Sequence, residues 1–211
     1  MQKLLFLVWL ILIGCGAPVT AEPIDPDHDG MSVYFDEEAT TFAYYVDDWI
    51  PAIGAGPTIT AYLIITRPYL PYPFLYIRAW EAHIEIITNS LTPPLRMQLE
   101  PCSVDYDNDP DDYVIGFCPC IGIDITGDAV ILGHVELNWL GIEGRAEAEF
   151  FITGVEGSLH FPDGPGYAVE AGFPSPCQPI FGTWGLCAWV NVHTIPIKNE
   201  TMTWGDVKTL Y

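Results

Sequence analysis

Basic residues and long apolar segments are both scarce in this chain of 211 residues. Lysine and arginine number 7 against 28 aspartate and glutamate residues, which gives a formal net charge of −21. A surface with that charge repels phosphate groups, so it excludes nucleic acid as a partner. The longest apolar run, residues 4–13, is too short for a membrane-spanning helix, which needs about 20 residues. The sequence therefore predicts that any membrane attachment depends on a lipid alone.

Catalytic signatures are missing as well. The chain contains no G-x-S-x-G elbow, H-E-x-x-H zinc motif, P-loop or Rossmann glycine pattern. A pair of carboxylates of the kind that glycosidases use can come from residues distant in sequence, so an extracellular glycan-acting hydrolase stays open as an alternative. The sequence favours a protein that is not an enzyme.

The first 21 residues have the pattern of an export signal. Lys3 precedes the apolar run, and small residues follow it as far as Ala21. The end of this segment, 19–21, is similar to a signal-peptidase site, whereas the segment 12–15 resembles the lipobox of bacterial lipoproteins. Cleavage before Cys15 would leave that cysteine lipidated and the protein tethered to a membrane. We predict a protein that is either secreted or lipid-anchored to the bacterial cell envelope.

The remaining chain has the composition of a protein made of strands and turns. Aromatic and β-branched residues are abundant, and 19 glycines and 19 prolines supply the turns. Apolar and polar residues alternate in short segments, which is typical of half-buried strands. The expected strands are 31–35, 58–66, 80–86, 113–117, 129–139, 145–150, 167–171 and 188–195.

Alternation also predicts which side chains face the core. In one strand Trp80, Ala82, Ile84 and Ile86 fall on the apolar face. In another, the predicted inward residues are Ala129, Ile131, Gly133, Val135, Leu137 and Trp139.

One convincing helix start occurs, near the end of the chain. Thr203 and Asp206 have the spacing of a capping box, with Val207, Leu210 and Tyr211 available for packing. We predict an acidic linker over 22–30 and one domain over 31–211. The expected fold class is all-β, an antiparallel β-sandwich of the jelly-roll type with a short C-terminal helix.

Five cysteines follow the signal, and an oxidising compartment favours disulfides. Cys177 and Cys187 close a short loop and are predicted to pair. Cys102 is predicted to pair with Cys118 or Cys120, because alternate residues of a strand point to the same side. One thiol would then stay unpaired.

Short segments of the domain resemble known proteins. They are Ser32-Val-Tyr-Phe-Asp36, Ala61-Tyr-Leu-Ile-Ile-Thr66, Ala79-Trp-Glu-Ala-His-Ile-Glu85, Asp128-Ala-Val-Ile-Leu132 and Met202-Thr-Trp-Gly-Asp-Val-Lys-Thr-Leu-Tyr211. Their order resembles a group of uncharacterised secreted bacterial proteins, and its middle is similar to cohesin-like sandwich domains, which are non-catalytic extracellular binding modules. The resemblance covers about 31–211 and implies a cohesin-like fold. Dockerin binding is not carried over to this chain.

Two acidic segments have spacing that suggests calcium. Asp25, Asp27 and Asp29 precede Gly30 as in the first half of a calcium loop, with Asp36 at the twelfth position. A second run contains Asp105, Asp107 and Asp109, with proline where the glycine would be. Calcium is the one cofactor that the sequence suggests. The alternative for both segments is a solvated acidic loop.

Two H-x-E pairs suggest a weaker metal hypothesis. His83 with Glu85 and His134 with Glu136 are expected on the outer faces of two strands. If those strands were neighbours, their imidazole and carboxylate groups could share a metal.

Aromatic residues between prolines give the best evidence for binding. Tyr69, Tyr72, Phe74 and Tyr76 alternate with Pro68, Pro71 and Pro73, which favour an extended and rigid loop. Their rings are a predicted platform for a sugar or a partner protein, unless they cover the core or form an edge strand. We predict an exported, non-catalytic binding or structural module whose partner is an extracellular protein or glycan. A further alternative is an envelope protein that assembles through its sheet edges.

Overall fold

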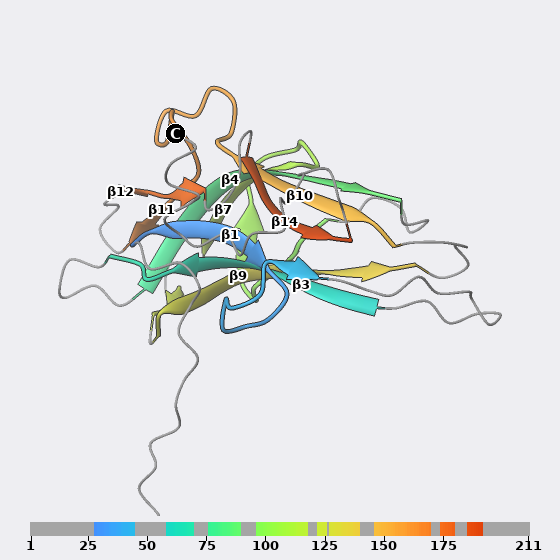
Figure 1. Ribbon diagram of the computed structural model, residues 1–211. Helices are drawn as coiled ribbons and strands as arrows, with labels where there is room; N and C mark the ends of the chain where they lie inside the picture. Colours follow the sequence, from blue (N-terminus) through green and yellow to red (C-terminus); the bar gives the residue numbers. More distant parts are fainter. Residues whose placement is uncertain are drawn as a thin grey trace, which may run out of the picture.

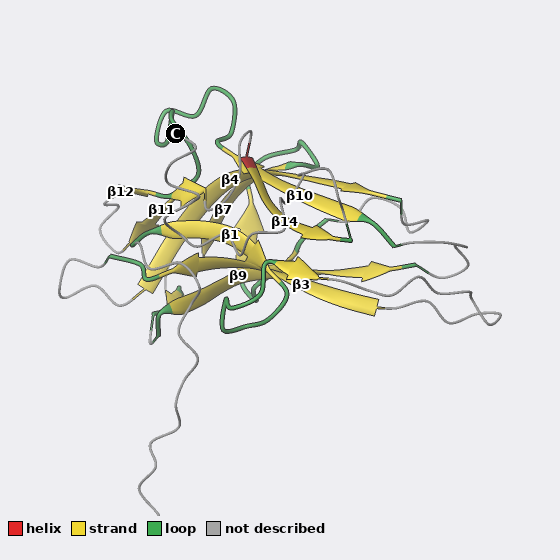
Figure 2. Ribbon diagram, in the orientation of Figure 1, coloured by secondary structure: helices red, strands yellow, loops and turns green. Residues whose placement is uncertain are grey.

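The computed structural model describes residues 28–44, 58–69, 76–89, 96–117, 122–125, 127–139, 146–169, 174–179 and 185–191. These segments consist of strands and loops, apart from a 3₁₀ position at Gly185 (Figure 2). The predicted signal, Cys15, the acidic linker before residue 28 and the predicted C-terminal helix lie outside them. No helix in the described segments is long and apolar enough to cross a membrane.

The described segments form fourteen strands. In chain order they are β1 (Gly30–Tyr34), β2 (Ala43–Tyr44), β3 (Thr58–Thr66), β4 (Tyr76–Thr88), β5 (Gln98–Leu99), β6 (Ser103–Asp105), β7 (Asp112–Phe117), β8 (Ile123–Asp124), β9 (Ala129–Asn138), β10 (Ala148–Thr153), β11 (Gly166–Val169), β12 (Pro174–Pro176), β13 (Gln178–Pro179) and β14 (Leu186–Val190).

The strands pack as two sheets, one above the other (Figure 1). Sheet A has the order β13-β1-β3-β9-β5. Sheet B has the path β12-β11-β4-β10-β14-β2, to which β7 and β8 add by pairing with β4, and β6 by pairing with β7. The pairs are antiparallel except for β1 with β13 and β14 with β2. The prediction of an all-β, antiparallel sandwich is confirmed.

Strand β4 follows the alternation expected from its sequence. Trp80, Ala82 and Ile84 are buried at 1%, 0% and 2% exposure, and they face sheet A across the core. His83 and Glu85 lie on the opposite face of β4, where they are more exposed. Burial of one face of each sheet therefore fixes the register of the strands.

Strand β9 departs from the predicted alternation at Leu132. The pairing of β3 with β9 skips this residue, which forms a β-bulge. After the bulge Val135 lies in the core as predicted. Before it Val130 lies in the core, while Ala129 and Ile131 pack on the outer face of sheet A. The predicted inward face was therefore wrong for Ala129 and Ile131, because one extra residue reverses the side that each neighbour faces.

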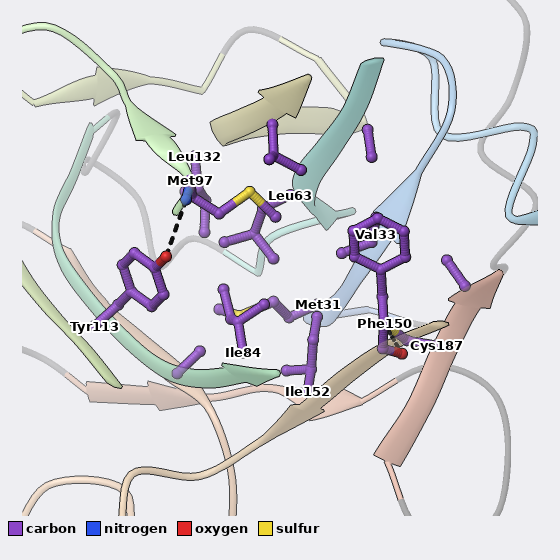
Figure 3. Close-up of a cluster of buried hydrophobic side chains, with 14 of the residues drawn as sticks. Met31, Val33, Leu63, Ile84, Met97, Tyr113, Leu132, Phe150, Ile152 and Cys187 are labelled. Carbon is purple, nitrogen blue, oxygen red and sulfur yellow. Dashed lines mark hydrogen bonds between the residues drawn. The ribbon is translucent and has the colours of Figure 1, made fainter. Parts of the chain in front are cut away.

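The core lies between the two sheets (Figure 3). Met31 and Leu63 from sheet A meet Ile84 and Phe150 from sheet B. The hydroxyl of buried Tyr113 accepts a hydrogen bond from the Met97 backbone N–H at 2.9 Å. Burial is the main cause of the raised pKa of Tyr113. This bond satisfies a polar group that would otherwise be buried without a partner.

The described cysteines do not pair. Cys102, Cys177 and Cys187 carry free thiols. Cys187 lies on β14 and its Sγ donates to the Phe150 carbonyl oxygen at 3.3 Å (Figure 3), whereas Cys177 lies between β12 and β13. The predicted Cys177–Cys187 bond is not formed, and three strands of sheet B, β11, β4 and β10, separate β12, which precedes Cys177, from β14, which carries Cys187. Burial raises the pKa of the Cys187 thiol to about 12, and the pKa of Cys177 is also raised, so both stay protonated.

For the other predicted disulfide, the structure describes one of the cysteines, Cys102. Cys102 is exposed and follows β5 in a turn. Both of its predicted partners, Cys118 and Cys120, lie outside the described residues.

Candidate functional site

Tyr69 is the described member of the predicted aromatic platform with the most exposed ring. It follows β3, where the chain leaves sheet A, and its exposed fraction is 63%. Tyr76 begins β4 in sheet B and is half-buried, with the Arg78 guanidinium 5.4 Å from the centre of its ring. Tyr72 and Phe74 lie outside the described residues. The structure therefore offers Tyr69 as an exposed ring and engages Tyr76 with a neighbouring cation.

The backbone of Tyr69 is held by Asp29. The Asp29 carboxylate accepts a hydrogen bond from the Tyr69 N–H at 2.7 Å, and the same oxygen accepts one from the Tyr167 hydroxyl. Tyr167 lies on β11 in sheet B and is 0% exposed. Burial and the hydrogen bond to Asp29 raise the pKa of Tyr167 above its ordinary value of 10.0. Asp29 thus links the start of β1 in sheet A with sheet B and with the segment that carries Tyr69.

The Arg67 carbonyl oxygen accepts two further hydrogen bonds in this arrangement. His28 Nδ1 donates to the Arg67 carbonyl oxygen at 3.0 Å, and the Asp29 N–H donates to the same oxygen at 3.3 Å. Asp29 and Arg67 both have positive φ angles, of 59° and 45°. Residues other than glycine rarely adopt this conformation, so the surrounding hydrogen bonds must stabilise it. We call His28, Asp29, Arg67, Tyr69 and Tyr167 the Tyr69 site.

The ring of His28 lies beside the ring of Tyr69. Their centroids are 6.4 Å apart and their planes are at 79°, so one ring presents its edge to the other. An exposed aromatic ring with a polar heteroaromatic ring at its side can stack on an apolar surface and also make hydrogen bonds. The Tyr69 site can therefore contact an amphipathic ligand.

The first predicted calcium loop is not formed as expected. Asp29 precedes β1 and Asp36 follows it, so five extended residues separate them. At about 3.3 Å per residue, the two carboxylates lie on the order of 20 Å apart and cannot share a cation. Asp36 instead accepts a hydrogen bond from the Thr40 N–H at 2.9 Å, closing the turn after β1. The prediction of Asp36 as a twelfth ligand was wrong. Asp25 and Asp27 lie outside the described residues.

The second acidic run forms a chain of local turns. Asp105, Asp107 and Asp109 each accept a hydrogen bond from the N–H two residues further on, at 3.1, 2.8 and 3.0 Å. Asp105 also accepts from the Val114 N–H at 3.2 Å and forms an ion pair with Arg96. Within the described residues, no three acidic, histidine or cysteine side chains gather as a metal-binding group. Calcium binding by this run stays a prediction.

The two H-x-E pairs lie on different sheets. His83 is on β4 in sheet B, where its Nδ1 is 2.6 Å from an Asp112 carboxylate oxygen. His134 is on β9 in sheet A, with its ring centroid 6.2 Å from that of Tyr62. Because each pair faces outward from its own sheet, the predicted shared metal site was wrong.

Sequence reasoning missed two side-chain contacts between distant segments. One joins Asp29 to Tyr167, and the other joins Glu81 to the Ser158 hydroxyl. The partners are 138 and 77 residues apart in the chain. No spacing pattern could have identified contacts over such separations. The burial of Glu81 on an outward-facing strand position is visible only in the fold.

Comparisons with known proteins give a distant structural similarity. No family model matches the chain, and no curated protein matches it. The sixth cohesin of scaffoldin B from Acetivibrio cellulolyticus, solved in complex with a Cel5 dockerin mutant, has 8% identity and a TM-score of 0.41. The match covers 79% of this chain and 100% of that one.

A type II cohesin domain from the cellulosome of Acetivibrio cellulolyticus also matches. It has 8% identity and a TM-score of 0.34, and the match covers 75% of this chain and 95% of that one. Both structures are cohesin domains. The fold class of this chain follows from the strand pairing described above.

Proposed function

We propose that this chain is an exported, non-catalytic binding module that holds a glycan against the ring of Tyr69. The observation that carries the proposal is that Tyr69 is 63% exposed while the Asp29 carboxylate holds its backbone N–H. A ring held in advance of binding loses little conformational freedom when a ligand arrives. A ring without such support would lose more conformational freedom on binding and would bind the ligand more weakly.

A glycan fits the Tyr69 site better than a large protein surface does. Sugar rings have apolar faces that can lie on an aromatic ring, and hydroxyl groups that need polar partners. Tyr69 offers the ring, while His28 is exposed at its side. Among the described residues, the other strongly exposed apolar side chains belong to sheet B and its loops. Within that part of the chain the exposed Tyr69 ring has the polar His28 ring at its side, which suits a small amphipathic ligand.

Export is part of the proposal and rests on residues 1–21 of the sequence. The module would work outside the cytoplasm, either free or tethered through a lipid on Cys15. Mass spectrometry of the mature N-terminus tests the two forms. A lipidated Cys15 supports the tether, and a free Glu22 terminus contradicts it.

Assembly through sheet edges is less favoured by the described edges. Strand β12, at one edge of sheet B, contains Pro174 and Pro176, and β13, at one edge of sheet A, contains Pro179. Proline has no N–H to donate to a neighbouring chain. The opposite ends of the two strand paths, β2 and β5, are two residues long, and β6, which pairs with β7 alone among the described strands, has three residues. Such edges offer little template for another strand.

The proposal is tested with a glycan array probed with purified protein. Wild type and Tyr69→Ala are compared, with Tyr72→Ala as a second variant and Tyr106→Ala as the matched control. Tyr106 is 72% exposed, lies between β6 and β7 of sheet B and is no part of the Tyr69 site. We expect Tyr69→Ala to weaken binding by at least about tenfold and Tyr106→Ala to leave it unchanged. Equal binding by all variants would remove Tyr69 from the binding surface.

The hydrolase alternative is tested on the same glycans. Any glycan that binds is incubated with wild-type protein and its reducing ends are measured. A non-catalytic module leaves the glycan intact. Release of reducing ends that depends on the protein would establish an enzyme instead.

A further inference from the structure

Exposed apolar side chains outside the Tyr69 site lie on sheet B and its loops. The large apolar side chains that are strongly exposed among the described residues are Tyr69, Ile87, Val104, Tyr106 and Leu159. Apart from Tyr69, they belong to β4, to β6 and the turn after it, and to the loop after β10. That loop rises from sheet B on the side away from sheet A (Figure 1). Their grouping on one sheet is the feature that the glycan proposal does not explain.

Leu159 is presented by a loop that is fastened to sheet B. The Ser158 hydroxyl donates to the Glu81 carboxylate, which is buried at 6% exposure on the outer side of β4. The same Ser158 oxygen accepts hydrogen bonds from the His160 and Phe161 N–H groups at 3.1 and 3.0 Å. Leu159, between these bonded residues, is 93% exposed. These bonds therefore hold the backbone on both sides of Leu159, whose apolar side chain is exposed to water.

Close backbone packing fixes the same loop at its base. A Cβ added at Gly154 would lie 2.9 Å from the Gly164 Cα, so the two ends of the loop touch. The Phe161 ring packs on Gly166 of β11, where an added Cβ would lie 2.1 Å from the ring. A side chain at either position would force the loop to move. The two glycines thus let the loop sit directly on the sheet.

Tyr106 is held beside the same part of β4. Its N–H donates to the Val114 carbonyl oxygen at 2.9 Å, and Val114 is the register partner of Glu81. Its ring lies over Gly116, where an added Cβ would be 2.9 Å from the ring. Tyr106 therefore bonds to the register partner of Glu81, and the Leu159 loop bonds to Glu81 itself. Val104, on β6, pairs with Gly116 and extends this apolar area.

Acidic groups surround these apolar side chains. Glu156 and Asp163 are exposed in the Leu159 loop, Asp109 is exposed in the turn after Tyr106, and Glu85 is exposed two residues before Ile87. The chain as a whole has a net charge of −21. An acidic rim of this kind attracts a basic partner and speeds its encounter. It also opposes a second copy of the same chain, because two such surfaces repel each other.

We propose that this surface, which we call the sheet B face and define by Ile87, Val104, Tyr106 and Leu159, docks a basic protein. The partner carries apolar side chains that pack on the sheet B face, and lysine or arginine residues around them that meet the acidic rim. Leu159 and Tyr106 supply the anchors, since they are preorganised by the contacts with Glu81, Val114 and Gly116. The Tyr69 site and the sheet B face share no residue, so one module can join a glycan to a protein.

The test uses a random-peptide library displayed on phage and selected against wild-type protein. We expect enriched peptides to combine large apolar residues with lysine or arginine. Their dissociation constants are then measured by calorimetry on Leu159→Ser and Tyr106→Ser, with Tyr69→Ala as the control. We expect both serine variants to weaken binding by at least about tenfold and the control to bind as wild type does. Leu159→Ser changes an exposed side chain, so circular dichroism should confirm an unchanged fold.

Other results would overturn the proposal. They are a selection without enrichment, enriched peptides that are not basic, or peptides that bind both serine variants as tightly as wild type. Sedimentation equilibrium covers a further case: a wild-type dimer that Leu159→Ser dissociates would assign the sheet B face to a second copy. Because the Tyr69 variant is the control here, this test can fail while the glycan proposal stands, and the reverse also holds.

Discussion

Asp29 and Asp107 have the same local sequence setting, yet the fold uses them differently. Each follows another aspartate by two residues. Asp29 accepts hydrogen bonds from Tyr69 and Tyr167, which are 40 and 138 residues away. Asp107 accepts one from the N–H two residues further on. One carboxylate joins distant segments, and the other shapes its own turn.

Asp105 is intermediate between the two. It closes a local turn with Asp107, but it also binds Arg96 and the Val114 N–H on β7. The sequence separation of the carboxylate from its partners therefore decreases from Asp29 to Asp105 to Asp107. We expect the cost of removing each carboxylate to follow that order, and the predictions below run from the largest expected effect to the smallest.

Asp29→Ala should be the most destabilising of these substitutions. It removes two hydrogen bonds to a carboxylate, leaves the buried Tyr167 hydroxyl without that acceptor, and places alanine at a positive φ angle. We expect a loss of about 3 kcal/mol in the free energy of unfolding, measured by urea denaturation. Asp29→Asn is the control, because asparagine tolerates positive φ and keeps an acceptor oxygen. A cost for Asp29→Ala no larger than that of Asp107→Ala would contradict the comparison.

Asp105→Ala should have an intermediate effect. The substitution removes the ion pair with Arg96 and the bond that ties the acidic run to β7. We expect a loss of about 1.5 kcal/mol, since one partner is charged and the site is half-buried. The matched variant Arg96→Met removes only the ion pair, and it should cost less in the same urea assay. If Arg96→Met lowers the free energy of unfolding by more than Asp105→Ala does, the ion pair and not the backbone hydrogen bond fixes the turn.

Tyr167→Phe should cost about 1 kcal/mol near neutral pH and should change the dependence of stability on pH. In the folded protein burial raises the pKa of Tyr167 above its ordinary value of 10.0. The unfolded chain then releases this proton first, so the stability is fully present below pH 10 and falls as the pH rises above it. Urea denaturation across this range should give a shallower fall for Tyr167→Phe than for wild type. Parallel curves would show that Tyr167 does not contribute to the fall.

Asp107→Ala should have the smallest effect, a change within about 0.5 kcal/mol in the free energy of unfolding in the same urea assay, because it removes a local turn bond at the surface.

The same variant tests calcium binding by the acidic run. If this run binds calcium with a dissociation constant of about 1 mM, several millimolar calcium should raise the stability of wild type by about 1 kcal/mol. Thermal melting should show that Asp107→Ala loses this gain. A wild-type Tm that calcium leaves unchanged removes calcium from the account of this loop.

Local patterns predicted the fold well and the contacts between distant segments poorly. The alternation over Trp80, Ala82 and Ile84 predicted the buried face of β4, because burial and strand period are both local in sequence. The bulge at Leu132 could not be read from alternation, since it depends on pairing with β3. The spacing of Asp29 and Asp36 suggested that both residues belong to one loop. The segment between them is instead the extended strand β1, which pairs with β3.

The candidate site was predicted in part for the same reason. The prolines around Tyr69 indicated an aromatic segment in which Tyr69 is exposed, and its role as a binding platform stays a prediction. The group that holds it, Asp29, was interpreted as a metal ligand. Its actual partner, Tyr167, comes from a strand of the other sheet. The spacing of carboxylates along the chain indicates which local turns can form. Long-range packing determines which groups each carboxylate bonds to.

The central claim is that the Tyr69 ring binds a glycan on a backbone fixed by Asp29. The most direct measurement is calorimetric titration of the best glycan from the array into wild type, Tyr69→Phe and Tyr69→Ala. We predict near wild-type affinity for Tyr69→Phe, which keeps the ring, and affinity at least about tenfold weaker for Tyr69→Ala. Equal affinity for wild type and Tyr69→Ala would contradict the claim.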